Sequence, residues 1–184
     1  IGTAQPTTDQ LQTAEHHFIA SHDITDDLSC GQYEVLALKR LQELFAHHEQ
    51  VIAVGGSGLY VRALCEGMDD LPHADETLRA ELTERLRRDG VAALAEELRE
   101  LDPVYYETVD RCNPSRVLRG MEVCLQTGRP FSEFRTGIKK ERNFQIVKVG
   151  LTLPRKELYA RIDRRVDAMM AAGLEAEARA LYPH

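Results

Sequence analysis

The sequence of 184 residues lacks the features that mark membrane-spanning, secreted and metal-binding proteins. No apolar run approaches the roughly 18 residues that a membrane-spanning helix requires. The opening residues, IGTAQPTT, have neither the basic start nor the apolar centre of a signal peptide. The four cysteines lie far apart without a C-x-x-C pair, which favours reduced thiols over disulfides or a zinc site. We therefore expect a cytoplasmic protein that is not attached to a membrane.

The composition, at 43% hydrophobic and 29% charged residues, is that of a globular chain of one domain with room for an insertion. The net charge of −7 is unevenly distributed. Residues 1–110 hold 8 Lys and Arg against 22 Asp and Glu, a net of −14, whereas residues 111–165 hold 14 against 5, a net of +9. Such a basic block is typical of a surface that meets a polyanion, although a merely solvated basic surface gives the same pattern.

The first part of the chain predicts a parallel α/β unit. Apolar runs at 17–20 and 51–54 predict strands, and the second is followed at once by a Gly-rich turn and a helix over 59–66. A helix over 29–48, with Ser29 as its N-cap, precedes the second strand. Helix, strand, Gly-rich turn and helix in this order indicate a parallel sheet.

Residues 75–135 contain start and stop signals of helices and no strand pattern. We predict helices from Asp75 to Gly90 and over 91–101, a start at Asp102-Pro103, and a helix from Asn113-Pro114 to Thr127 that Gly128 ends. This pattern predicts a helical insertion of about sixty residues. Strand character returns at 144–151, and Pro154 then opens a long helix to Gly173, followed by another over 174–182.

Two groups of residues could carry chemistry. The turn GGSGLY places the Ser57 hydroxyl at a helix N-terminus, where it could face a ligand, although capping the helix is the commoner role of a serine there. Arg161, Arg164 and Arg165 share one helix face, as do Arg116 and Arg119 on another helix. Guanidinium groups so arranged suit phosphate oxygens, and an ordinary solvated face is the alternative.

Five collinear blocks resemble the tRNA dimethylallyltransferase (tRNA isopentenyltransferase) family. They are IGTAQPT at 1–7, VGGSGLYVRAL at 54–64, EGMDDLP at 66–72, NPSRVLRGMEVCLQTGRP at 113–130 and LYARIDRRVDAMMAAGL at 158–174. The resemblance implies an α/β fold with a P-loop-type parallel-sheet core and an all-helical insertion. Residues 1–73 and 139–184 would then form the core, and residues 74–138 would grip the anticodon stem-loop of tRNA.

The resemblance also implies a reaction. A dimethylallyl group would move from dimethylallyl diphosphate to the exocyclic amine of an adenosine next to the tRNA anticodon, in a monomeric enzyme that uses Mg²⁺. Arg161 would face the diphosphate, and Ser57 would lie close to the acceptor adenosine. The tRNA would be contacted by Ser57, Arg79, Ser115, Arg116, Val117, Leu118 and Arg119. Gln5 replaces the usual Lys of the GTAKP block, which removes a charge there.

The chain begins without Met, and we expect the family's P-loop and the Asp that takes the acceptor proton to lie upstream of it, with further segments downstream. Three alternatives stay open. An adenylate isopentenyltransferase would use the same donor on a free nucleotide, but it needs neither the helical insertion nor its basic block. A non-catalytic RNA-binding module and a relative of nucleotide kinases are the others.

Overall fold

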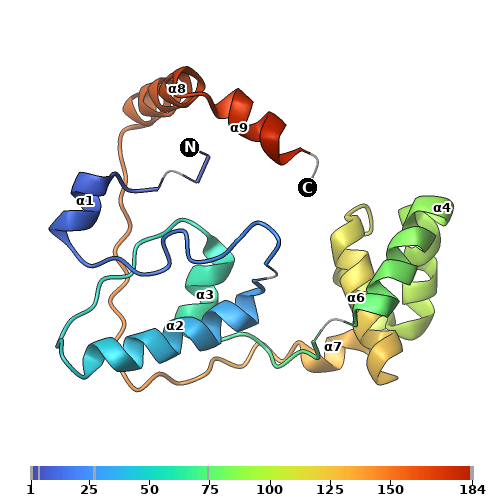
Figure 1. Ribbon diagram of the computed structural model, residues 1–184. Coiled ribbons are helices and arrows are strands. Elements are labelled where there is room, and N and C mark those ends of the chain that lie inside the picture. The colour runs from blue at the N-terminus through green and yellow to red at the C-terminus, as the bar shows by residue number, and fades with distance from the viewer. Residues whose placement is uncertain (1, 4, 27, 74, 183–184) are drawn as a thin grey trace. The chain divides into compact units, whose positions relative to one another are not determined.

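A computed structural model describes residues 2–3, 5–26, 28–73 and 75–182, and the regular secondary structure in these ranges is helical (Figure 1). The helices are α1 (Thr8–Thr13), α2 (Cys30–Phe45), α3 (Gly58–Glu66), α4 (Glu76–Leu101), α5 (Pro103–Thr108), α6 (Pro114–Thr127), α7 (Phe131–Phe134), α8 (Arg155–Ala171) and α9 (Leu174–Leu181). Within these ranges, no helix combines the length and the apolar character needed to cross a bilayer.

The predicted start and stop signals set the helix ends. The Asn113 side chain accepts a hydrogen bond from the backbone N–H of Arg116 at 3.2 Å, Pro114 occupies the first turn, and Gly128 ends α6 in the left-handed conformation. Asp102 caps α5 in the same way, through the N–H of Tyr105 at 2.9 Å. These caps satisfy backbone groups that the helix itself leaves unpaired, so the predicted bounds of α6 are confirmed.

The predicted break at Gly90 is also confirmed. Gly90 has φ 81° and ψ 164° inside α4, a backbone conformation that residues with a Cβ rarely adopt. Arg85 and Glu97 form an ion pair across this break. In a straight helix these residues would stand about 18 Å apart, so the two halves of α4 must turn back on each other at Gly90.

The predicted parallel sheet is not found in the part of the chain that the structure describes. Residues 51–54 and 144–151 run without regular structure, because a strand needs a neighbour to bond its N–H and C=O groups and the described chain supplies none. The segment at 17–20 is bent rather than extended, with positive φ at Phe18 (61°) and Ala20 (48°). The strand predictions, and with them the sheet, are wrong for these residues.

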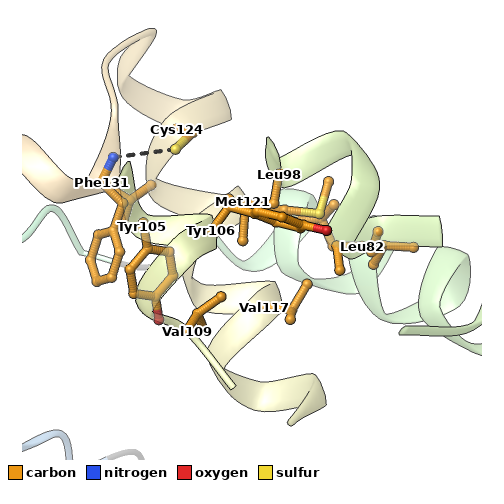
Figure 2. Packing of buried hydrophobic residues seen from close by; sticks show 12 residues of the cluster. Leu82, Leu98, Tyr105, Tyr106, Val109, Val117, Met121, Cys124 and Phe131 are labelled. Carbon is orange, nitrogen blue, oxygen red and sulfur yellow. Dashed lines mark hydrogen bonds between the residues drawn. The ribbon is translucent and has the colours of Figure 1, made fainter. Parts of the chain in front are cut away.

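The chain divides into two compact units: residues 29–145, which we call the central unit, and residues 1–28 with 146–184, which we call the terminal unit. The core lies in the central unit, where α4, α5, α6 and α7 pack together (Figure 2). Its buried side chains are Leu82, Leu94, Ala95, Leu98, Tyr105, Tyr106, Val109, Val117, Met121, Val123, Cys124 and Phe131. The terminal unit contains α1, α8 and α9, and none of its described residues is buried.

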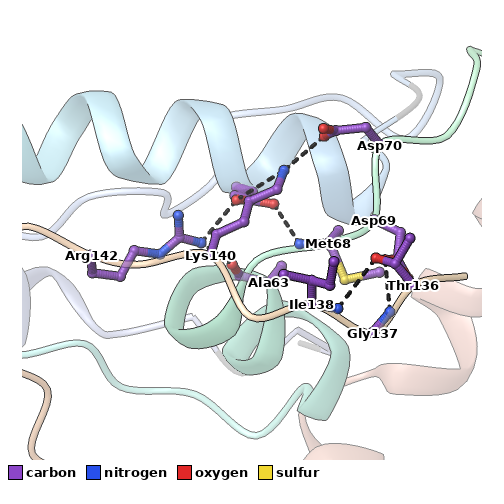
Figure 3. A network of polar contacts seen from close by, with 10 residues as sticks. Ala63, Met68, Asp69, Asp70, Thr136, Gly137, Ile138, Lys140 and Arg142 are labelled. Atoms are coloured by element: carbon purple, nitrogen blue, oxygen red, sulfur yellow. Dashed lines mark hydrogen bonds and ion pairs between the residues drawn. The ribbon is translucent and has the colours of Figure 1, made fainter. Parts of the chain in front are cut away.

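A polar network joins α2 and α3 to the segments that lead into and out of the α4–α7 helices (Figure 3). Arg142 is nearly buried and donates to the Glu34 carboxylate and to the Ala63 carbonyl, both at 2.8 Å, and to the Leu64 carbonyl at 2.9 Å. Glu34 accepts a further bond from the Met68 N–H at 2.8 Å. We call these contacts the Glu34–Arg142 clasp.

The same two segments also bond to each other beside the clasp. The Lys140 N–H donates to the Glu66 carbonyl at 2.8 Å, and the Thr136 hydroxyl donates to Asp69 at 2.7 Å. The Lys140 ammonium pairs with Asp70 at 2.8 Å. The segment that enters the α4–α7 helices and the segment that leaves them are therefore held side by side.

Candidate functional site

The Gly-rich turn before α3 presents an exposed hydroxyl. Ser57 is at the N-cap position of α3, but its side chain makes no capping hydrogen bond, so the predicted capping role is wrong. A Cβ placed on Gly55, Gly56 or Gly58 would meet no atom within 4 Å. Packing within the described chain therefore does not require glycine at these positions, whereas close approach of a ligand to the backbone would.

Helix α3 is fixed against α2 by stacked tyrosines. The rings of Tyr33 and Tyr60 stack with their centroids 4.6 Å apart. Burial, followed by the nearby Cys65 and Tyr60, raises the pKa of the Tyr33 phenol above its ordinary value, so the phenol stays neutral at physiological pH. This packing holds the N-terminus of α3, and with it Ser57, on a defined support.

The segment Ser115–Arg119 starts α6, and its side chains differ in exposure. Ser115 and Arg116 are exposed, and Leu118 and Arg119 are partly buried. Val117 is fully buried in the core, which leaves its side chain no surface to offer to a ligand. The Tyr105 hydroxyl donates to the Arg116 carbonyl at 3.3 Å, so the backbone at Arg116 is held while its side chain projects from α6.

Arg79 on α4 meets α6 at a buried carboxylate that the sequence analysis missed. Glu122 accepts from Arg119 Nη1 at 2.6 Å and from Arg79 Nη2 at 3.3 Å, and Arg79 Nε lies 3.2 Å from its other oxygen. Arg119 Nη2 also donates to the Pro72 carbonyl at 2.9 Å. The structure thus joins two of the predicted arginines, Arg79 and Arg119, through one acidic residue. Glu122 lies three residues after Arg119 on the same helix, and this spacing is the sequence signal that could have identified it as a partner of Arg119.

In the terminal unit, Arg161, Arg164 and Arg165 share one face of α8, as their spacing predicts. With Leu153, Glu157 and Ala160 they line an open hollow of about 610 Å³. The three guanidinium groups give the hollow a positive character that Glu157 offsets only in part, which suits an anion such as a diphosphate. Gln5, also in the terminal unit, is exposed.

Comparison with known proteins identifies the family. All 184 residues match the family model described as IPP transferase. The chain belongs to the IPP transferase family. It is 47% identical to tRNA dimethylallyltransferase 1 of Phocaeicola vulgatus over 183 residues and 49% identical to tRNA dimethylallyltransferase 2 of Porphyromonas gingivalis (strain ATCC 33277) over 183 residues. In both cases the match covers 100% of this chain and 61% of the relative, so the chain spans about three-fifths of their length.

The fold agrees with this assignment. The crystal structure of the full-length tRNA isopentenylpyrophosphate transferase from Bacillus halodurans superposes with a TM-score of 0.55 at 34% identity. That match covers 99% of this chain and 56% of the crystallised one. The resemblance that the sequence blocks indicate is thereby confirmed at the level of the family.

The described residues show no ready-made site for the Mg²⁺ that the resemblance implies. Across the described ranges, no three His, Cys, Asp or Glu side chains are grouped so that they could hold a metal ion. Since Mg²⁺ prefers carboxylates together with substrate phosphates, we assign no step of the reaction to the ion here.

Proposed function

We propose that the protein transfers a dimethylallyl group from dimethylallyl diphosphate to the exocyclic amine of an adenosine beside the tRNA anticodon. The observation that carries this proposal is membership of the IPP transferase family over the whole chain, with relatives named tRNA dimethylallyltransferase. We propose that the enzyme is cytoplasmic, as we expect from the sequence, and that it acts as a monomer, as the family resemblance implies.

The proposed tRNA contacts lie on the α4–α7 helices and the turn before α3. Ser115 and Arg116 expose their side chains at the start of α6, and half of the Arg79 side chain is exposed on α4. Arginines on a surface of this kind neutralise phosphates and release counterions, which gives affinity for RNA. We propose that residues 74–138 form the tRNA-gripping insertion and that residues 1–73 and 139–184 belong to the catalytic core.

In the proposed reaction the adenosine amine attacks the allylic carbon of the donor, the bond from that carbon to the diphosphate oxygen breaks, and the amine loses one proton to a base. The acceptor must first leave the stacked loop, at a cost of a few kcal/mol. We propose that Arg161 stabilises the negative charge that grows on the leaving diphosphate, since a preorganised donor acts most strongly where charge develops. Ser57 would hold the acceptor through its hydroxyl.

A transfer assay tests the proposal. Labelled dimethylallyl diphosphate is supplied with tRNA, with a tRNA that has guanosine in place of the acceptor adenosine, or with adenosine monophosphate. We expect label only in the first tRNA, because guanosine carries an oxygen where adenosine carries the amine. Label in the free nucleotide would favour an adenylate isopentenyltransferase, and RNA binding without transfer would favour an RNA-binding module.

Replacement of Arg161 tests the proposed diphosphate site. Arg161→Ala should lower the single-turnover rate about 100- to 1000-fold, the range for loss of one donor to developing charge, with little change in tRNA affinity. Lys156→Ala, on the same helix but outside the hollow, is the matched control and should react at nearly the wild-type rate. Weakened tRNA binding with unchanged chemistry would instead make Arg161 a tRNA contact.

A further inference from the structure

Glu122 is an unusual neighbour for two arginines of a proposed RNA-binding surface. It lies in the middle of α6 and is 2% exposed. A buried carboxylate is costly unless opposite charges and hydrogen bonds compensate it. Arg79 and Arg119 supply the opposite charge from two different helices, α4 and α6, and both donate to Oε2, whereas Oε1 accepts no hydrogen bond within the described ranges. The three side chains therefore form one unit, which we call the Glu122 cluster.

The two arginines of the Glu122 cluster differ in how far their side chains are exposed to a ligand. Arg119 uses both terminal nitrogens, one on Glu122 and one on the Pro72 carbonyl, and its side chain is 26% exposed. Arg79 donates to Glu122 through Nη2 and brings Nε within 3.2 Å of the other carboxylate oxygen, and its side chain is 52% exposed. A guanidinium has five N–H donors, so the two arginines differ in exposure and not in the number of donors that they keep. Arg79 is therefore the better placed of the two to meet a phosphate while it keeps its contact with Glu122, whereas Arg119 is held between Glu122 and the Pro72 carbonyl and is half as exposed.

The charges of the Glu122 cluster support the same division. Two guanidinium groups and one carboxylate leave a net charge of +1, and the exposed member is Arg79. Without Arg119, the carboxylate would neutralise Arg79 completely. Arg119 also fixes the chain before α4, because it bonds to Pro72 while Gln126, two turns further along α6, donates to the His73 carbonyl at 3.0 Å.

We propose that Glu122 and Arg119 are positioning residues, which hold Arg79 oriented and positively charged as the phosphate contact of this cluster. The inference rests on the proposed function, since it takes tRNA to be the ligand. An arginine already fixed in its binding geometry loses less conformational freedom when the phosphate arrives. Arg119 would then affect tRNA binding through Arg79 and not through a contact of its own.

A double-mutant cycle, made in the protein as it is naturally encoded, tests whether Arg79 contacts the phosphate and Arg119 only positions Arg79. Binding of a tRNA anticodon stem-loop is measured by fluorescence anisotropy for the wild type, Arg79→Gln, Arg119→Gln and the double variant. We expect Arg79→Gln to weaken binding about tenfold, the effect of losing one charged hydrogen bond. Arg119→Gln alone should weaken binding about three- to tenfold. Added to Arg79→Gln, it should change binding less than about twofold, because coupled residues are not additive.

Two controls separate positioning from a loss of fold. Arg87→Gln removes an exposed arginine of α4 that pairs with the likewise exposed Glu84, and it should bind as the wild type does. In every variant the KM for dimethylallyl diphosphate should stay unchanged, which a damaged fold would not allow. Arg119→Lys keeps the charge without the planar fork and enters the same cycle if Arg119→Gln does not fold.

The outcomes are distinct. If Arg119→Gln weakens binding by the same factor with and without Arg79, Arg119 contacts the RNA itself and the inference is overturned while the proposed function stands. If Arg79→Gln binds like the wild type, the exposed member of the cluster is not a contact, and the inference is likewise overturned. A wild-type protein that does not bind the stem-loop at all overturns the proposed function and this inference with it.

Discussion

In the central unit, helices α4 to α7 pack around twelve buried apolar side chains, whereas no described residue of the terminal unit is buried. Both units have amphipathic helices. In α8, Leu158, Ile162, Val166 and Met170 recur at helical spacing, yet each is about half exposed. An apolar stripe indicates that a helix face is suited to burial, but it does not specify which segment covers that face.

The difference lies in where the packing partners come from. The core of the central unit is formed by helices that follow one another within residues 76–134, so its partners are close in sequence. The bounds and the apolar faces of these helices are specified by caps, breaks and periodicity that one stretch of chain contains. In the terminal unit α9 follows and contacts α8, yet it leaves the apolar side chains of α8 about half exposed. The two units should therefore respond very differently to equivalent substitutions.

The largest expected effect is a cavity in the core of the central unit. Leu98→Ala should lower the free energy of unfolding by about 4 kcal/mol, because Leu98 is fully buried and a leucine-to-alanine change loses transfer energy and leaves a void. The matched change in the terminal unit, Ile162→Ala, should cost less than about 1 kcal/mol, since that side chain is about half exposed. Urea unfolding followed by circular dichroism measures both.

Similar losses for the two variants would mean that α8 is covered as well as α4 is, and the comparison between the units would fail. Amide hydrogen exchange provides a second measurement. The N–H groups of α4 and α6 should exchange far more slowly than those of α8, because protection follows burial and local contact density.

The sequence predicts the α4–α7 helices better than the sheet, for a physical reason. The ends of α6 follow from Asn113, Pro114 and Gly128, which act within one turn of the chain. A strand at 51–54 depends instead on a neighbouring strand that the local sequence does not contain. Ile52 and Val54 have the apolar character of a buried strand, but without a ladder their segment stays irregular and both side chains are exposed.

The candidate site, like the fold, has one part that the sequence predicts and one part that it does not. The spacing of Arg161, Arg164 and Arg165 is sufficient to place them on one face of α8, and the structure agrees. Contacts between helices are not readable from spacing. Nothing in the sequence brings Arg79 of α4 to Glu122 of α6, because that contact depends on how the two helices pack. Arg79 was identified through family resemblance alone.

The next largest effect concerns the Glu34–Arg142 clasp of the central unit. Arg142→Gln should cost about 3 kcal/mol, because removal of one partner leaves the buried Glu34 carboxylate undercompensated and frees the carbonyls of Ala63 and Leu64. Arg40→Gln, which breaks a half-exposed pair with Glu43 on α2, is the control and should cost at most about 0.5 kcal/mol. Equal losses in urea unfolding would show that the clasp does not stabilise the unit.

The smallest effect, and one that differs in sign from its control, concerns the turn inside α4. Gly90 lets the two halves of α4 fold back on each other, so that Leu82 from one half and Leu94 from the other enter the same core. A Cβ at Gly90 would touch no atom within 4 Å, so Gly90→Ala adds no clash and acts only through the backbone. At φ 81° and ψ 164° that strain should lower the free energy of unfolding by about 2 kcal/mol.

Gly31→Ala in α2 is the matched control, because a Cβ there also meets no atom within 4 Å, but the backbone is helical. It should leave stability unchanged or raise it by up to about 1 kcal/mol, since alanine loses less backbone entropy than glycine in a helix. Thermal unfolding of the two variants measures whether each substitution lowers or raises the stability. If Gly90→Ala were the more stable variant, α4 could continue through residue 90 as one straight helix. The Arg85–Glu97 pair and the shared burial of Leu82 and Leu94 would then not be needed for the core that distinguishes the central unit from the terminal one.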